Sequence, residues 1–120
     1  MVAEIDFVTA ATVAYYLLRE GYEVRTVKSG KELIEEVEKI QPDLIIMDII
    51  LPEINGLKVA EALKNNEKTS HIPILIHSTL NMPERAHKAG ADEFLLKPIN
   101  AEKLMDAVRR LLANRTSKGD

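Results

Sequence analysis

Five residues of this 120-residue sequence could together handle a phosphate group and a divalent cation. Asp48, Ser78 and Lys97 each follow a short apolar run, and Glu4 and Asp6 follow the first three residues. Clustered carboxylates suit a hard cation such as Mg²⁺, which takes oxygen ligands and keeps several waters. A lysine and a hydroxyl suit phosphoryl oxygens, because phosphoryl transfer depends mostly on positioning and charge neutralisation. The residue types therefore point to phosphoryl chemistry, provided that the fold brings them together.

The apolar runs that precede these residues predict strands. Leu44–Met47 and Pro73–Ile76 are continuously apolar, which is typical of strands covered by helices on both faces. Glu93–Leu96 predicts a last strand, whereas Tyr22–Val27 alternates apolar and polar residues and predicts an edge strand. Only Met1–Ala3 is available for a first strand before Glu4, which is short for the centre of a sheet.

Apolar residues between these runs recur at helical spacing, with Gly or Pro near several of the helix ends. The expected helices are Thr9–Arg19, Gly30–Ile40, Leu57–Asn65, Pro83–Ala89 and Ala101–Leu112. We expect one domain over residues 1–113, and residues 114–120 to be a flexible tail or the start of a linker.

Strands that alternate with helices predict a parallel α/β sheet built from right-handed crossovers. In open sheets of this kind, function lies at the carboxyl ends of the strands, near the point where the strand order switches. We therefore expect Asp48, Ser78 and Lys97 to converge at one edge of the sheet, with Glu4 and Asp6 close by.

Composition excludes several classes of function. A net charge of −3 gives no general attraction to nucleic acid, and the absence of cysteine excludes disulfides and thiolate metal sites. His71, His77 and His87 lack the spacing of a zinc site. No apolar run approaches the roughly 18 residues that span a bilayer, and the N-terminus lacks the basic region of a signal peptide. We expect a cytoplasmic protein that binds neither nucleic acid nor membrane.

Three segments resemble the receiver domains of two-component response regulators. Pro42–Gly56 is similar to the segment around the family's phosphorylated aspartate, here Asp48. Ser78-Thr79 is similar to its hydroxyl-plus-small pair, and Ala89–Pro98 resembles its last-strand signature. The match runs from about Gly21 to Leu112. It implies a flavodoxin-like, doubly wound sheet of five parallel strands in the order 2-1-3-4-5, with helices on both faces.

The resemblance implies that Asp48 accepts a phosphoryl group from a phosphohistidine on a histidine kinase or a histidine phosphotransfer protein. Lys97 would contact that group, and Mg²⁺ would be held by Asp48, by Glu4 or Asp6, and by the backbone carbonyl of Ile50. We expect no enzymatic activity beyond the domain's own phosphoryl transfer and dephosphorylation.

The resemblance also implies a switch. Ser78 would move toward the phosphoryl group, Phe94 would rotate, and the Lys97-Pro98 peptide bond would be cis. A new charge of about −2 would then bias a bistable arrangement of loops and change the face offered to a downstream protein or output domain. The oligomeric state stays open, although many receivers form homodimers through the last strand and helix.

The sequence departs from the family pattern in two places. An ungapped register aligns the family's adjacent acid pair with Glu4 and Ile5, which removes the direct metal ligand. A register shifted by one residue aligns the pair with Ile5 and Asp6, which restores it. About three residues are also missing between Ser78 and Gly90, so the fourth helix should be shorter by nearly a turn.

Other interpretations remain open at this point. A degenerate receiver would bind partners without Mg²⁺-dependent phosphorylation, as Ile5 at the acid position suggests. A flavodoxin-like cofactor binder would need a phosphate-cradling loop after the first strand, and Phe7–Thr9 is a poor candidate for one. Taken singly, Asp48 could merely cap a turn, and the acids near the first helix could simply favour its dipole.

Overall fold

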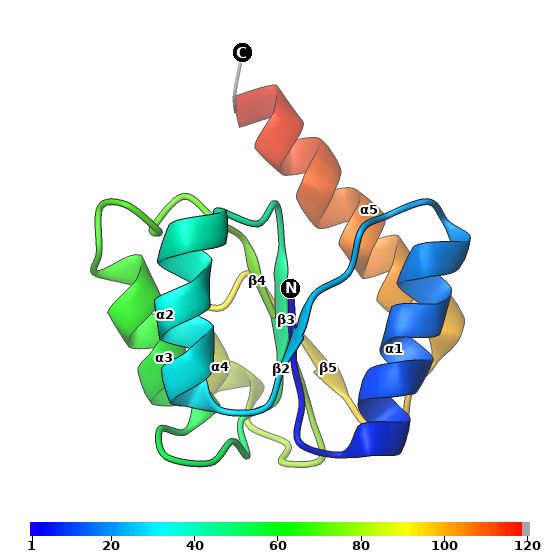
Figure 1. The fold of residues 1–120 in the computed structure, drawn as a ribbon, viewed down its shortest axis with the longest axis horizontal. Helices are drawn as coiled ribbons and strands as arrows, with labels where there is room; N and C mark the ends of the chain where they lie inside the picture. The colour runs from blue at the N-terminus through cyan, green and yellow to red at the C-terminus, as the bar shows by residue number, and fades with distance from the viewer. Residues whose placement is uncertain (119–120) are drawn as a thin grey trace.

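The structure is a computed structural model that describes residues 1–118 as a parallel sheet between two layers of helices (Figure 1). All strand pairs are parallel, and the sheet order β2-β1-β3-β4-β5 confirms the predicted flavodoxin-like topology. It places β2 at one edge and β3 at the centre, as predicted. The strands are β1 (Val2–Ala3), β2 (Thr26–Val27), β3 (Ile45–Met47), β4 (Ile74–Ser78) and β5 (Glu93–Leu96).

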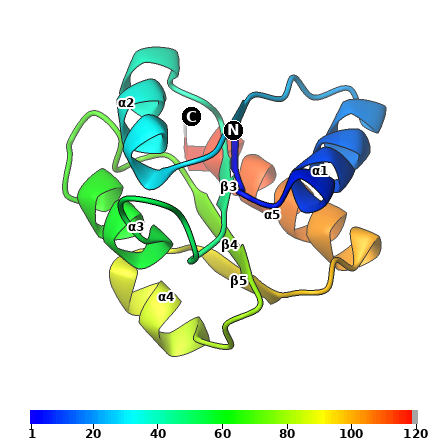
Figure 2. The same cartoon turned by 60° about the horizontal axis from the view of Figure 1, so that its bottom comes forward.

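The helices divide between the two faces of the sheet, as Figures 1 and 2 show. One face carries α1 (Phe7–Arg19) and α5 (Ala101–Lys118), and the other carries α2 (Gly30–Ile40), α3 (Gly56–Lys64) and α4 (Pro83–Ala89). The seven-residue α4 is short, in agreement with the residues missing before Gly90. No helix within residues 1–118 combines the length and the apolar character needed to cross a bilayer.

Alternation along the central strand divides the core into two clusters. Ile45 and Met47 pack against α2, α3 and α4, whereas Ile46 packs toward α1 and α5. Because β3 is covered on both faces, all three of its side chains are buried. Each such side chain stabilises the fold by roughly 1.5–3 kcal/mol relative to an exposed one. This double burial explains the unbroken apolar run in the sequence.

Four helices begin at polar residues that cap them. Each capping side chain accepts a hydrogen bond from the backbone N–H three residues later, which satisfies a donor left free at a helix start. The pairs are Asp6 with Thr9, Ser29 with Glu32, Asn55 with Lys58 and Asn100 with Lys103. These caps fix where α1, α2, α3 and α5 begin after the strand ends, and so they set the positions of the loops that carry the site.

Some predicted boundaries were wrong. The strand expected over Tyr22–Val27 contains only Thr26 and Val27, because the two-residue β1 offers no longer partner. The last helix continues to Lys118 rather than ending at Leu112, since no Pro or Gly interrupts it over those residues. It thus crosses the predicted domain boundary at residue 113, which stays a prediction. Residues 119 and 120 of the predicted tail lie outside the described residues.

Candidate functional site

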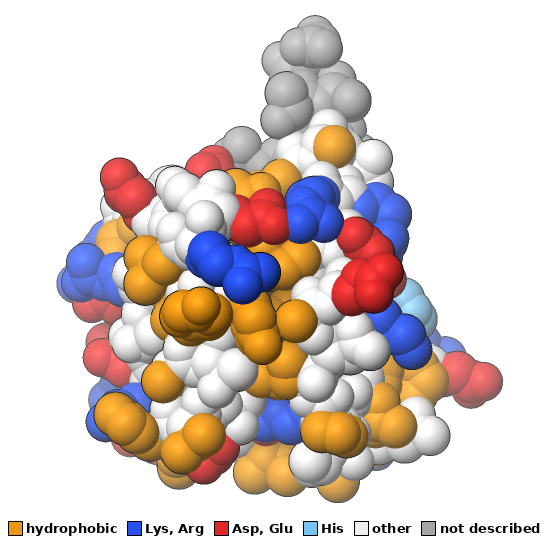
Figure 3. All heavy atoms as spheres, turned by 90° about the vertical axis from the view of Figure 1, so that its right-hand side faces the viewer, with side chains coloured by type: hydrophobic (Ala, Val, Ile, Leu, Met, Phe, Trp, Pro, Cys, Tyr) orange, Lys and Arg blue, Asp and Glu red, His pale blue; other side chains and the backbone are white. Residues whose placement is uncertain are grey.

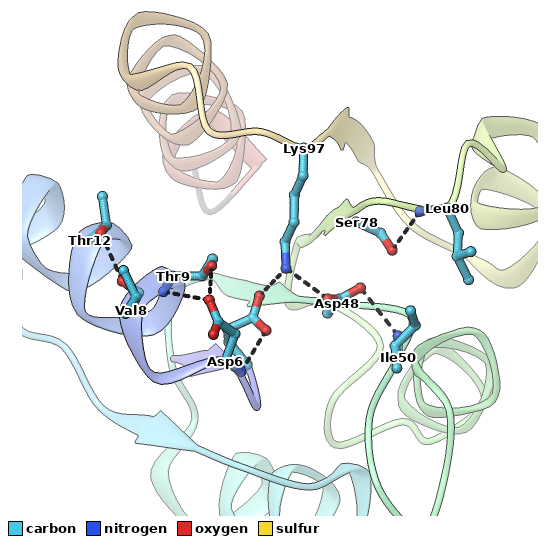
Figure 4. Close-up of polar contacts among 10 residues, drawn as sticks. Asp6, Val8, Thr9, Thr12, Asp48, Ile50, Ser78, Leu80 and Lys97 are labelled. Carbon is cyan, nitrogen blue, oxygen red and sulfur yellow. Dashed lines mark hydrogen bonds and ion pairs between the residues drawn. The ribbon is translucent and has the colours of Figure 1, made fainter.

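Lys97 lies between two buried carboxylates at the carboxyl edge of the sheet (Figure 4). Its Nζ is 2.5 Å from Glu4 Oε1 and 2.8 Å from Asp48 Oδ2. The three residues follow β1, β3 and β5, and the buried Ser78 ends β4 between them. The predicted convergence of Glu4, Asp48, Ser78 and Lys97 is therefore present in the structure.

The backbone around Asp48 is held on both sides. Its N–H donates to the Ala3 carbonyl at 3.2 Å, and its Oδ1 accepts from the Ile50 N–H at 3.2 Å. Beyond it, the Gly56 N–H donates to the Ile49 carbonyl at 2.7 Å. A β-carbon at position 56 would lie 2.2 Å from the Asp48 carbonyl oxygen, so the first turn of α3 can approach this closely only with glycine there.

Electrostatics keep Asp48 ionised despite its burial. Burial alone would raise the pKa of this carboxyl, but hydrogen bonds from Lys97, Ser78 and the Ile50 N–H lower it below its ordinary value. Burial likewise opposes the charge on Lys97, and the two carboxylates raise its pKa above the ordinary lysine value. One ammonium thus faces two carboxylates, which leaves a net charge of −1 to attract a further cation.

Ser78 and Phe94 lie next to this cluster. The Ser78 hydroxyl accepts a hydrogen bond from the Leu80 N–H at 3.3 Å, which ties it to the loop after β4. Phe94 pairs with Ile76 across β4 and β5 and packs half-buried against the core. The Lys97-Pro98 peptide bond is cis, as the resemblance predicts. The switching roles of Ser78 and Phe94 stay predictions.

The acids near α1 lie in different environments. Glu4 points into the site and contacts Lys97, whereas the Ile5 side chain is 52% exposed. Asp6 is bonded to Thr9, whose N–H and hydroxyl both donate to its Oδ2. The hydrogen bonds from Thr9, together with nearby Lys97, lower the pKa of the Asp6 carboxyl. This arrangement fits the ungapped register, in which Glu4 is followed by an apolar residue.

His77 is a residue near the site that the sequence argument considered only as a zinc ligand. It is 3% exposed, and within the described part of the chain its imidazole has no hydrogen bond. Burial, and to a smaller extent Lys97, lower its pKa to about 4, although Asp48 opposes this shift. The period of two along β4 could have located it, because His77 shares a sheet face with the buried Leu75.

We expect His77 to make stability depend on pH. The unfolded imidazole binds a proton below about pH 6.5, whereas the folded one does so only near pH 4. The free energy of unfolding should therefore fall by roughly 3 kcal/mol as the pH drops from 6.5 to 4, beyond the loss due to carboxylates. Urea unfolding of wild type and His77→Leu across this range measures the difference. Parallel pH profiles for the two proteins would contradict the assignment.

We expect Lys97→Met to destabilise the fold by about 3–5 kcal/mol at pH 7, because it leaves two buried carboxylates without a counter-charge. Adding Asp48→Asn should recover part of that loss, since only Glu4 then remains charged. Urea unfolding of the single and double variants gives the coupling energy. Equal stability of Lys97→Met and the double variant would show that the charge on Asp48 does not cause the loss, and wild-type stability of Lys97→Met would show that the ion pairs have little structural weight.

Comparison with known proteins assigns the family. The model of the response regulator receiver domain matches residues 1–109. The chain belongs to the receiver domain family. A curated relative, the polar-differentiation response regulator DivK of Brucella ovis, is 34% identical over 97 residues, which cover 78% of this chain and 79% of the relative. This receiver domain is thus a module of two-component signalling and resembles DivK.

Solved structures agree with the fold of this receiver. The chemotaxis response regulator CheY4 of Vibrio cholerae superposes with a TM-score of 0.85 at 28% identity, over 92% of this chain and 94% of that one. The receiver domain of sensor histidine kinase PA1611 from Pseudomonas aeruginosa PAO1 also gives 0.85, at 24% identity over 93% and 94% of the two chains. That structure holds a magnesium ion in its active-site cleft.

Proposed function

We propose that this receiver accepts a phosphoryl group on Asp48 from a histidine kinase or histidine phosphotransfer protein, and so switches a surface for a downstream protein. The contact between Lys97 and Asp48 is the observation that carries the proposal. It places a fixed cation beside an ionised, buried carboxylate at the carboxyl edge of the sheet. The Ser78 hydroxyl also donates to this carboxylate, so a second group that could contact phosphoryl oxygens lies beside it.

The described residues fit a Mg²⁺ site that has few protein ligands. No three of their His, Cys, Asp and Glu side chains form a metal-binding group. Mg²⁺, however, is often bound through one or two carboxylates with several waters retained. Glu4 and Asp48 would supply those carboxylates, and the Ile50 carbonyl would join them. Asp6, whose Oδ2 accepts from Thr9, could add a third carboxylate.

The residues of the chain divide the work of transfer between them. The ionised Asp48 attacks phosphorus, so an O–P bond forms as the N–P bond to the donor histidine breaks. The Lys97 ammonium can contact the oxygens of the transferred phosphoryl group, because it already contacts Asp48. The Ser78 hydroxyl can donate to another of these oxygens. Bound Mg²⁺ would supply further charge neutralisation of the phosphoryl group.

The surroundings of Asp48 suit a protein donor. Ile5, Phe7 and Val8 are exposed beside the site, and Ile50 and Leu96 extend this apolar rim. Figure 3 shows hydrophobic side chains along the lower edge of the face that carries α1 and α5. Exposed apolar residues that gather in this way mark contact surfaces for proteins. We include a cytoplasmic location in the proposal, since kinases of this type phosphorylate their receivers there.

The rival function is a receiver that binds partners without phosphorylation. The exposed Ile5, at the position of the family's second acid, favours it, because the direct metal ligand is then missing. The two functions share the fold and the apolar rim. They differ in whether Asp48 reacts.

We expect acetyl phosphate with Mg²⁺ to add one phosphoryl group to the protein, as measured by intact mass. Asp48→Asn should show no gain, because the nucleophile is lost while the fold keeps its Glu4–Lys97 pair. Mg²⁺ alone and acetyl phosphate with chelator serve as controls. A folded wild-type protein that gains no mass in any condition would favour the rival function.

We also expect Ile5→Asp to tighten Mg²⁺ binding, on the order of tenfold or more, since it adds a carboxylate beside Glu4. Val8→Asp is the matched control, because it makes the same charge change at another exposed apolar residue. Calorimetric titration with MgCl₂ measures both. If the two variants bind Mg²⁺ equally, then Ile5 does not occupy the position of a direct ligand.

A further inference from the structure

A groove between α3 and α4 lies beside the site but is not part of it. Its volume is about 570 Å³, and Figure 2 shows the two helices side by side, with the loops after β3 and β4 leading into them. The floor is the outer edge of the core. It consists of Ile49, Leu51, Leu57 and Ala89, with Met82 packed partly against them. These four floor residues are themselves buried, with at most 8% of each residue exposed.

The rim of this α3–α4 groove is mainly basic. Lys58 on α3 and Arg85 and Lys88 on α4 line it, against one acid, Glu61. None of the three cations has an ion pair or side-chain hydrogen bond with the described residues, whereas Lys64 nearby is paired with Asp92. In a chain of net charge −3, an apolar floor with three unpaired cations is a local exception. Its charge complement is an acidic, apolar surface.

We propose that the α3–α4 groove is a docking site for an acidic amphipathic segment of a partner protein. The segment would place apolar side chains on the floor and carboxylates near Lys58, Arg85 and Lys88. The nine-residue α3 is about 13 Å long, so two to three turns of a partner helix would fill the groove. The lining combines apolar side chains with cations, which favours a peptide over a small anion.

The groove is linked to the phosphorylation site through two loops. Ile50 and Leu80 both line it, and Figure 4 shows them beside Asp48 and Ser78. The Ile50 N–H donates to Asp48, and the Leu80 N–H donates to Ser78. A phosphoryl group that drew on either hydrogen bond would move a residue of the groove. This coupling, unlike the docking itself, rests on the proposed function.

The test of docking uses a phage-displayed library of random 12-residue peptides, selected on the unphosphorylated protein and counter-selected on K58E/R85E/K88E. We expect enriched peptides that combine acidic with large apolar residues. Synthetic copies should bind the counter-selected variant roughly tenfold or more weakly by fluorescence anisotropy. Binding should also weaken as salt rises. Failure to enrich acidic, apolar peptides would overturn the proposal.

K28E/K31E/K39E is the matched control, because it makes the same charge change at exposed lysines outside the groove. It should bind the peptides within about twofold of wild type, since exposed charges at a distance are screened. An equal loss of peptide affinity in both triple variants would show that only the net charge of the protein matters, and would overturn the proposal. So would tighter binding to vesicles of anionic phospholipid than to the peptides.

Amide chemical shifts of the wild-type protein give a second measurement, which does not depend on whether the substituted proteins fold. Peptide binding should perturb Leu57, Arg85 and Ala89, and perturbations confined to α1 would overturn the proposal. For the coupling, affinity is measured again after acetyl phosphate treatment. Unchanged affinity in protein that carries the phosphoryl group would overturn the coupling, whereas absence of the mass gain would count against the proposed function alone.

Discussion

The contact of one ammonium with two buried carboxylates organises this molecule. Lys97, which follows the edge strand β5, contacts Glu4 and Asp48 and so joins the ends of β1, β3 and β5. Each charge would be costly alone in this buried position, and each is stabilised by the others. The sheet order brings them together, because every parallel strand ends at the same edge. Stability and reactivity therefore depend on the same three side chains.

This arrangement makes the charge balance of the site sensitive to any added group. The cluster carries a net charge of −1 with Asp48 ionised. Phosphorylation would add further negative charge where one lysine is already shared. The cluster could relieve that excess by binding a cation, or by redrawing the hydrogen bonds from Ile50 and Leu80. The loops that contain Ile50 and Leu80 are thus the parts of the structure that a change of charge at Asp48 would affect most directly.

Much of this could be predicted from the sequence because the informative residues follow strong patterns. The apolar runs before Asp48 and Lys97 predicted strands, and their order predicted that the chemistry would meet at one edge. The role of Asp6 was not predictable in the same way. Its capping of α1 depends on a helix that begins at Phe7, two residues earlier than the pattern indicated. His77 was missed because the apolar run that predicted β4 ends at Ile76, whereas the strand continues through the buried His77 to Ser78.

Gly56 gives the acceptor loop a mechanical property of its own. Its backbone rests against the Asp48 carbonyl with no room for a β-carbon, and its N–H is bonded to Ile49. In the middle of the loop, the Pro52 carbonyl accepts a hydrogen bond from the Gly30 N–H at the start of α2. The loop is thus clamped between the first turns of α2 and α3. Because Gly56 at the start of α3 is in direct contact with the Asp48 carbonyl, a shift of the Asp48 backbone would also displace the start of α3.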